Sequence, residues 1–184
     1  MIILGGGIVY GTLRRKEIVS MLEGNGKPLS GTYLAGLLKV SRQVIVQDIA
    51  ILRAEGKGII ATPQGYFIPD YSSSKKTVKR VIACIHTREE IGDELKTIIS
   101  MGGRVIDVLV EHPVYGELRG MLMLLSIYDA DEFVKKLKEG VGQPLLVLTA
   151  GVHLHTIEAE SEEKLNMIEE RLKNKGYLLD SRYE

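Results

Sequence analysis

Cysteine is almost absent from this 184-residue sequence, and so is net charge, since 24 basic residues balance 24 acidic ones. The single cysteine, Cys84, excludes an internal disulfide, and without a cysteine cluster a structural zinc finger is excluded as well. Cys84 lies in the apolar run VIACIH, so we expect a small core residue at this position. A reducing cytoplasm fits this cysteine usage.

Long apolar runs are absent too. The opening MIILGGGIVYGTL is too short to span a bilayer and lacks the charged start of a secretion signal. We therefore expect no membrane partner, and we expect residues 1–12 to be a leader without a function of its own. The sequence also shows no phosphate-binding loop and no nucleophile motif, so we do not expect an enzyme.

The zero net charge hides an asymmetry along the chain. Residues 1–66 carry eight Lys or Arg against four Asp or Glu, a charge of +4, and the remaining residues carry −4. A basic first third on a neutral chain indicates a polyanion as the partner of that third.

Three short helices and a hairpin are predicted in this basic part. The first helix begins at Arg14, the second covers Thr32 to Lys39, and the third follows Ser41 as its N-cap and ends at Gly56. A turn at residues 63–65 then separates two short apolar strands. This order is typical of a winged helix-turn-helix domain, which we place at residues 1–69.

The side chains expected to bind double-stranded DNA lie at the start of the third helix. Arg42, Gln43 and Gln47 are predicted to point outward there, and both residue types reach base edges and phosphates. Ser41 and Lys57, which flank the helix, complete the predicted set. The plainer alternative is a three-helix bundle that does not bind DNA.

This first part resembles a known family. The stretch SRQVIVQDIAILRAEG followed by IIATPQGYFI is similar to the winged helix-turn-helix of the biotin-repressor type. The positions that match that pattern are Ser41, Arg42, Asp48, Ile49, Leu52, Arg53, Gly56, Gly65 and Tyr66.

A polar, serine-rich linker is predicted at residues 70–76, and the pattern changes after it. Residues 77–184 alternate between strands and helices in the order strand, helix, strand, strand, helix, strand, helix, strand. Mixed order of this kind predicts an α+β sandwich with the helices on one face of the sheet. The whole chain is therefore expected to be α+β, with a DNA-binding domain followed by a regulatory domain.

Three of the four histidines of the chain are predicted to meet in this second domain. His86 ends the first strand, and His153 and His155 share one face of a later strand. Glu94 lies beside the buried stripe of the intervening helix, where a carboxylate needs a partner. Three imidazoles and a carboxylate are a donor set for a divalent transition metal such as Ni, Zn or Fe. The alternative is an ordinary histidine pair on the surface of a sheet.

The second domain also resembles a known family. TVKRVIACIHTREEIGDEL, DVLVEHPVYGELRG and LTAGVHLHTIEAES are similar to the three-histidine (3H) domain of niacin-responsive transcriptional repressors, and the two resemblances together cover about Arg14 to Tyr177. The resemblance implies a divalent metal held by His86, Glu94, His153 and His155, with nicotinic acid as the effector. The motifs themselves match at the three histidines. The assignment of Glu94 as a ligand comes from its spacing after His86 and from its position on the helix face.

A second group, His112, Tyr115 and Arg119, is predicted to bind the effector. Tyr115 is able to stack on a pyridine ring, and Arg119 is able to pair with a carboxylate. The alternative is a turn followed by exposed sheet, since His112 directly precedes a proline.

The expected function is a metal-containing repressor of NAD-biosynthesis or niacin-uptake genes, with nicotinic acid as co-repressor and a homodimer on the operator. One rival is a transcription factor that senses the metal ion itself. Another is a metal-dependent hydrolase fused to the helix-turn-helix. The hydrolase would need a general base near the metal, and Glu158 is predicted on the opposite strand face from His155.

Overall fold

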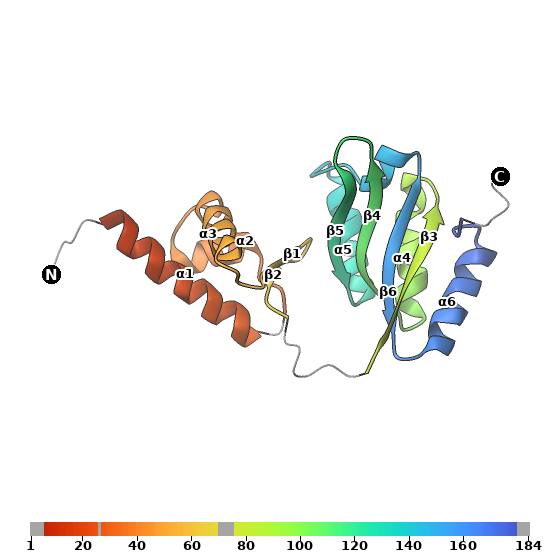
Figure 1. Cartoon of the computed structure of the whole chain (residues 1–184), viewed down its shortest axis with the longest axis horizontal. Helices are drawn as coiled ribbons and strands as arrows, with labels where there is room; N and C mark the ends of the chain where they lie inside the picture. Colours follow the sequence, from red (N-terminus) through yellow and green to blue (C-terminus); the bar gives the residue numbers. More distant parts are fainter. Residues whose placement is uncertain (1–5, 26, 70–75, 180–184) are drawn as a thin grey trace. The chain divides into compact units, whose positions relative to one another are not determined.

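The computed structural model describes residues 6–25, 27–69 and 76–179, and the chain forms two compact units, residues 1–74 and 75–184 (Figure 1). Apart from Lys76, the predicted linker lies outside the described residues. Among the helices of the described residues, none combines the length and the apolar character that crossing a membrane requires.

The first unit contains three helices and a hairpin, as predicted. The elements are α1 (Gly6–Asn25), α2 (Gly31–Leu38), α3 (Arg42–Ala54), β1 (Ile60–Thr62) and β2 (Gly65–Phe67). Helix α1 begins earlier than the expected start at Arg14, so residues 6–12 are part of this helix. No proline between Gly6 and Arg14 forces a later start of the helix. Residues 1–5 of the predicted leader lie outside the described residues.

Side-chain caps fix the starts of α2 and α3. Ser30 Oγ accepts a hydrogen bond from the Tyr33 amide at 3.1 Å, and Ser41 Oγ accepts one from the Val44 amide at 3.3 Å. Each cap satisfies a backbone donor that the helix itself leaves free. The apolar faces of the three helices then pack into one core, whose fully buried members include Ile18, Leu22, Leu34 and Ile45.

The hairpin is joined to the segment that precedes α2. Leu29 and Tyr66 exchange two backbone hydrogen bonds of 2.8 and 2.9 Å. Gly65 has φ +143°, and a Cβ atom at this position would lie 2.2 Å from the Leu29 carbonyl oxygen. Only glycine fits this approach, so the predicted wing is held against the helical core at a defined position.

The second unit is an antiparallel four-stranded sheet with helices. Its elements are β3 (Val78–Ile85), α4 (Ile91–Ser100), β4 (Arg104–His112), β5 (Gly116–Leu124), α5 (Ile127–Lys138), β6 (Val152–Ala159) and α6 (Glu162–Asn174). Short 3₁₀ helices at Arg88–Glu90 and Leu145–Thr149 precede α4 and β6. The predicted α+β class is confirmed, although the expected last strand is reduced to one bridge between Cys84 and Leu178.

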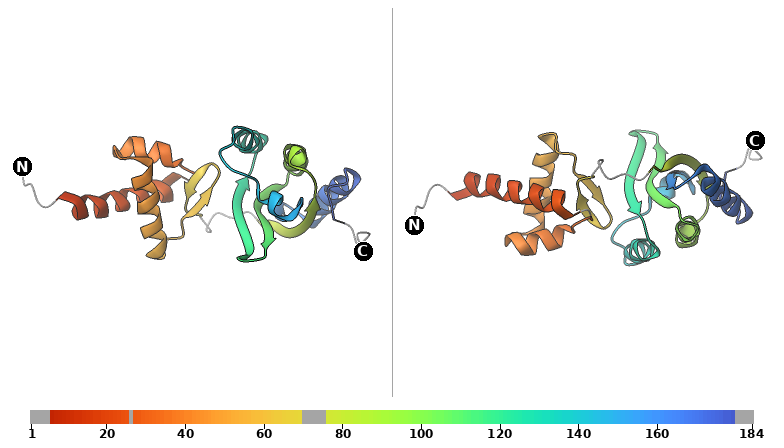
Figure 2. Two further views of the ribbon diagram at one scale, coloured as in Figure 1. Left: turned by 90° about the horizontal axis from the view of Figure 1, so that it is seen from above. Right: turned by 90° about the horizontal axis from the view of Figure 1, so that it is seen from below.

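The strand order in this sheet is β3-β6-β4-β5, so the last strand of the sheet lies between the first two. Helix α4 contacts both α5 and α6, and the three helices cover one face of the sheet (Figure 2). Along β6, His153, His155, Ile157 and Ala159 are buried and point toward the helices. This face of β6 positions two of the four predicted metal ligands, His153 and His155.

One buried carboxylate links two helices of the first unit. Asp48 on α3 is 2% exposed, and its Oδ2 lies 2.5 Å from Arg14 Nε of α1. Arg15 Nη1 lies 3.3 Å from Asp48 Oδ1. A buried carboxylate requires hydrogen-bonding partners, so these contacts fix α3 relative to α1.

The substitution Asp48→Ala should therefore destabilise the first unit. We expect a loss of about 1–3 kcal/mol, because two arginine side chains lose their partner, although both are partly exposed. Hydrogen exchange of the α3 amides measures this unit separately from the second one. Glu55→Ala, at the exposed end of the same helix, is the control and should leave the exchange unchanged. Equal exchange in both variants would contradict the role of Asp48.

Candidate metal centre

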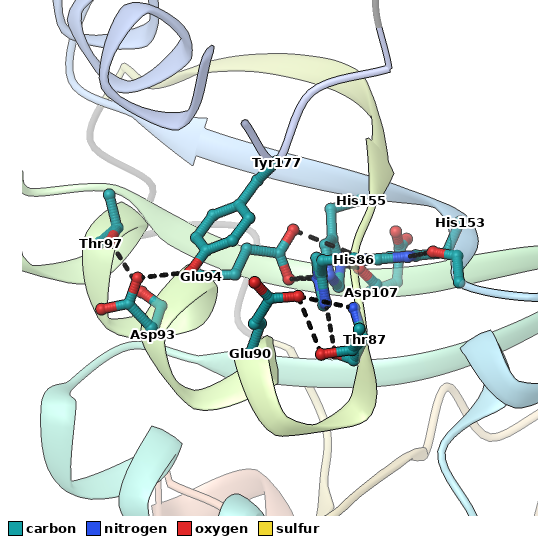
Figure 3. Close-up of polar contacts among 11 residues, drawn as sticks. His86, Thr87, Glu90, Asp93, Glu94, Thr97, Asp107, His153, His155 and Tyr177 are labelled. Atoms are coloured by element: carbon teal, nitrogen blue, oxygen red, sulfur yellow. Dashed lines mark hydrogen bonds and ion pairs between the residues drawn. The ribbon is translucent and has the colours of Figure 1, made fainter. Parts of the chain in front are cut away.

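The four predicted metal ligands lie together beneath helix α4 (Figure 3). His86 directly follows β3, Glu94 is in the first turns of α4, and His153 and His155 are on β6. All four are buried, with exposed fractions of 7%, 1%, 2% and 3% respectively. Residues far apart in sequence meet here because β3 and β6 are antiparallel neighbours.

The Glu94 carboxylate is the centre of the group. Its Oε2 lies 2.8 Å from His86 Nε2 and 3.3 Å from His155 Nε2, and its Oε1 lies 3.6 Å from His153 Nε2. Neighbouring rings also contact each other edge-on, with His153 centred 4.7 Å from His86 and 4.9 Å from His155. The three Nε2 atoms thus converge on one carboxylate.

Backbone carbonyls orient all three rings in the same manner. The Nδ1 atom of His86 lies 2.8 Å from the Thr87 carbonyl oxygen, that of His153 lies 2.9 Å from Gly151 O, and that of His155 lies 2.7 Å from Asp107 O. A carbonyl only accepts, so each Nδ1 carries the proton and donates it. In a neutral ring the Nε2 atom is then an unprotonated acceptor.

Unprotonated Nε2 atoms and the Glu94 carboxylate are all hydrogen-bond acceptors, so they repel one another unless a positive charge lies between them. Within the described part of the chain, His153 Nε2 and Glu94 Oε1 are buried without a hydrogen-bond partner. Buried polar atoms of this kind require an explanation, and a cation bound between them is one. Imidazole nitrogens fixed by Nδ1–H donation to a carbonyl are the usual arrangement in metal sites. The residues therefore fit a divalent transition metal.

The charge of the Glu94 carboxylate and the charges of the imidazoles around it influence each other. Burial alone would raise the pKa of Glu94, but attraction to His155 and contacts with the other imidazoles hold it well below its usual range. Burial would lower the pKa values of His86 and His155, but the Glu94 carboxylate raises both above their usual value. These pKa shifts have one cause: the Glu94 carboxylate favours positive charge on the imidazoles around it. A bound cation would supply the same positive charge.

The loop around His86 is itself held in place. Thr87 donates hydrogen bonds of 2.8 Å from its amide and from its hydroxyl to Glu90 Oε2. Tyr177 packs its ring 5.4 Å from the His86 ring and donates a 2.7 Å hydrogen bond to Asp93. Burial and this contact with Asp93 raise the pKa of Tyr177 to about 12, so the hydroxyl keeps its proton.

Gly151 contacts the site from the start of β6. Its carbonyl oxygen accepts hydrogen bonds from His153 Nδ1 and, at 3.4 Å, from the His86 amide. Its φ angle is +99°, and a Cβ atom there would lie 2.6 Å from the His86 carbonyl oxygen. Glycine is therefore required for both its conformation and this close approach.

Cys84 is the residue that sequence analysis missed. Its sulfur, a Glu94 oxygen and a His153 ring nitrogen all lie within 4.8 Å of one another. The expectation of a buried core residue holds, but this side chain also faces the site. The signal was its spacing of two residues from His86, which puts both on one strand face. Burial and the neighbouring Glu94 raise the pKa of its thiol.

A hollow of about 690 Å³ opens beside the site. Its lining includes His153 and Leu154 from β6, Thr149 from the preceding turn, and Glu111 and Glu117 from the β4–β5 hairpin. The hollow therefore reaches His153, and Glu111 and Glu117 make its hairpin side acidic.

The predicted effector residues do not line this hollow. His112 Nδ1 accepts hydrogen bonds from the amides of Val114 and Tyr115 at 3.2 and 3.3 Å, as expected for a residue that shapes a turn. Tyr115 is 73% exposed at the hairpin tip. Arg119 lies 3.6 Å from Asp107 and 3.6 Å from Glu117, and it does not join the other two.

The predicted DNA contacts form a group at one end of α3. Ser41, Arg42, Gln43 and Gln47 are all exposed there. Lys57 is exposed as well but follows the other end of the helix, roughly 20 Å away at 1.5 Å per residue.

Comparison with known proteins identifies both units. Residues 14–67 match a family model described as an HTH domain, and residues 79–181 match one described as the 3H domain. These matches define a two-domain class of DNA-binding regulator in which a helix-turn-helix precedes a 3H domain.

Two relatives span the same two domains. The probable transcription repressor NiaR of Thermotoga maritima is 48% identical over 167 residues, which cover 91% of this chain and 94% of that protein. The transcription repressor NadR of Bacillus subtilis is 39% identical over 172 residues, which cover 93% and 96%. The chain belongs to this family of transcription repressors with an HTH and a 3H domain. The relatives' names indicate a regulator rather than an enzyme.

The substitution Gly151→Ala should disturb the site without removing a ligand. Gly140→Ala is the matched control, because Gly140 also has a positive φ, +73°, but no described atom lies within 4 Å of its added Cβ. Both variants should lose about 1–2 kcal/mol from the left-handed conformation. Only Gly151→Ala should also move the NMR signals of the His86, His153 and His155 rings. Unchanged ring signals in Gly151→Ala would show that this glycine does not position the site.

Proposed function

We propose that this repressor holds a divalent transition metal, Ni, Zn or Fe, through His86, Glu94, His153 and His155, and that nicotinic acid binds as its co-repressor. The regulated genes would be those of NAD biosynthesis or niacin uptake, as the family resemblance implies. The protein would act on operator DNA in the cytoplasm as a homodimer.

The observation that carries the metal proposal is the orientation of the three rings. Each Nδ1 is engaged by a backbone carbonyl, so each Nε2 is directed at the Glu94 carboxylate. A divalent ion bound between the three Nε2 atoms and the carboxylate would use all of these acceptors at once. With three or four protein ligands, a five- or six-coordinate ion keeps an open position for an external ligand.

The charges around the hollow support nicotinic acid as a metal-dependent ligand. Glu111 and Glu117 line the hollow, so a free carboxylate entering it meets like charge. A divalent ion near His153 would offset this repulsion and bind either the carboxylate or the ring nitrogen. Tyr115 and Arg119 do not line the hollow, so their stacking or pairing with the acid would take place outside it, at the β4–β5 hairpin, where His112 shapes the turn.

DNA binding is proposed through the first turns of α3. Arg42, Gln43 and Gln47 are exposed and have the residue types that bind guanine and adenine edges, while Ser41 and Lys57 would contact phosphates. Two such helices in a symmetric dimer would reach successive major grooves. Nicotinic acid would then favour the dimer geometry that fits the operator.

Metal dependence of nicotinic acid binding is the central prediction. Calorimetric titration of the acid into the metal-loaded full chain should give heat, and chelator-treated protein should bind at least about tenfold more weakly. His153→Ala should behave like chelated protein, since it loses a ligand. His112→Ala removes the histidine outside the centre and should keep its metal by elemental analysis, so it is the matched control for metal content.

Nicotinamide is the ligand control, because it lacks the carboxylate. Equal binding of the acid with and without metal would refute the proposed role of the ion. A chain that binds metal and changes its DNA affinity with metal, but ignores the acid, would be a sensor of the metal ion instead. Full metal content in His153→Ala would refute the ligand assignment.

The recognition helix gives a separate prediction. Arg42→Ala should weaken binding to the DNA sequence that the wild-type chain selects from a random library, by about 1–3 kcal/mol, and should relax the preference at one base position. Arg53→Ala removes the same charge from the other end of α3 and serves as the control. The variants are compared by fluorescence anisotropy at one salt concentration. Equal losses in the two variants would show general electrostatics instead of base recognition.

A further inference from the structure

We infer that Cys84 is an additional donor to the metal, which binds the ion through its sulfur and makes the site selective for thiophilic ions. This inference rests on the metal centre proposed above. It adds a soft ligand to the three imidazoles and the carboxylate, and it changes which ions the site should prefer.

Strand register places Cys84 at the site. Cys84 on β3 is directly opposite His153 on β6, and Ile82 is opposite His155. Side chains of directly opposed residues on one sheet face lie close together, so the sulfur and the His153 ring are neighbours. Cys84 is completely buried on the helix-covered face.

The two unpartnered atoms of the site belong to the two residues that lie beside this sulfur. Glu94 Oε1 and His153 Nε2 are buried without a hydrogen-bond partner among the described residues, and they lie 3.6 Å apart. These two residues and the Cys84 sulfur form the group whose donor atoms lie within 4.8 Å of one another. By contrast, Glu94 Oε2 already contacts His86 and His155.

These separations suit one ion. With metal–sulfur distances of about 2.3 Å and metal–nitrogen or metal–oxygen distances of about 2.0–2.2 Å, neighbouring donors on one ion lie roughly 3.0–3.6 Å apart. The distance between Glu94 Oε1 and His153 Nε2 already agrees with this value. On binding, the thiol proton leaves to solvent and the thiolate forms the bond to the metal.

A sulfur donor has a consequence for selectivity. Thiolate ligands favour zinc and other thiophilic ions, whereas carboxylate and carbonyl oxygens suit magnesium, calcium and manganese. A site with Cys84 bound should therefore discriminate against manganese more strongly than three imidazoles and a carboxylate would alone.

Cobalt(II) provides the test, since a bound thiolate adds a charge-transfer band in the near ultraviolet. The chain has a single cysteine, so a band of this kind can come only from Cys84. The full chain is loaded with cobalt(II), and bound metal is measured by elemental analysis. We expect the band at full intensity in the wild-type chain.

Two variants and a competition measurement accompany this spectrum. Cys84→Ser and Cys84→Ala should lack the band, and their visible d–d absorption should change because the ligand set differs. Zinc affinity should fall by more than the roughly 10- to 100-fold that loss of an outer-shell partner costs, while manganese affinity should change much less. Circular dichroism shows whether each variant is folded. If neither variant folds, the charge-transfer band of the cobalt-loaded wild-type chain alone decides whether Cys84 is a ligand.

The outcomes separate this inference from the proposed function. If wild-type protein binds cobalt without the charge-transfer band, Cys84 is not a ligand, although the histidine centre stands. If His153→Ala keeps its full metal content, the histidine centre itself is wrong. Equal losses of zinc and manganese affinity in Cys84→Ser would also overturn the selectivity role.

Discussion

The second unit is organised around the buried carboxylate of Glu94. Glu94 is 1% exposed beneath a sheet and a helix layer, where an unpaired carboxylate would be very costly. Its pKa lies well below the usual range, so the surroundings favour the charged form despite burial. The stability of this arrangement depends on positive charge supplied by protons on the imidazoles or by a metal ion. A domain built in this manner has its state of charge coupled to its packing.

Backbone atoms, rather than further side chains, orient the imidazoles. The carbonyls of Thr87, Gly151 and Asp107 each receive one Nδ1–H group. Asp107 lies where the register between β4 and its neighbours shifts, so an irregular strand presents its carbonyl to His155. A distortion of the strand or of the turn would therefore rotate an imidazole directly. This gives a physical route by which events at the surface of the sheet reach the buried centre.

The sequence predicted much of this arrangement. Periodicity and caps located α2, α3 and the strands, and the spacing of two residues placed His153 and His155 on one face. The face argument also placed Glu94 correctly inside. Cys84 was missed because its contact with His153 depends on strand register, which the pattern of one strand does not determine. The acidic hollow was missed for the same reason, since Glu111 and Thr149 meet only after the hairpin and the turn before β6 have folded.

The strand order has a consequence for how the chain acquires its shape. Strands β3 and β4 are both made before β6, yet in the sheet β6 lies between them. During synthesis the two early strands have no shared hydrogen bonds to form, and each keeps an open edge until residues 152–159 arrive. The pairing of β3 with β6 spans most of the unit, which slows folding. A chain that is still being synthesised would therefore depend on rapid completion of β6, or on chaperones, to prevent its open strand edges from pairing with other chains.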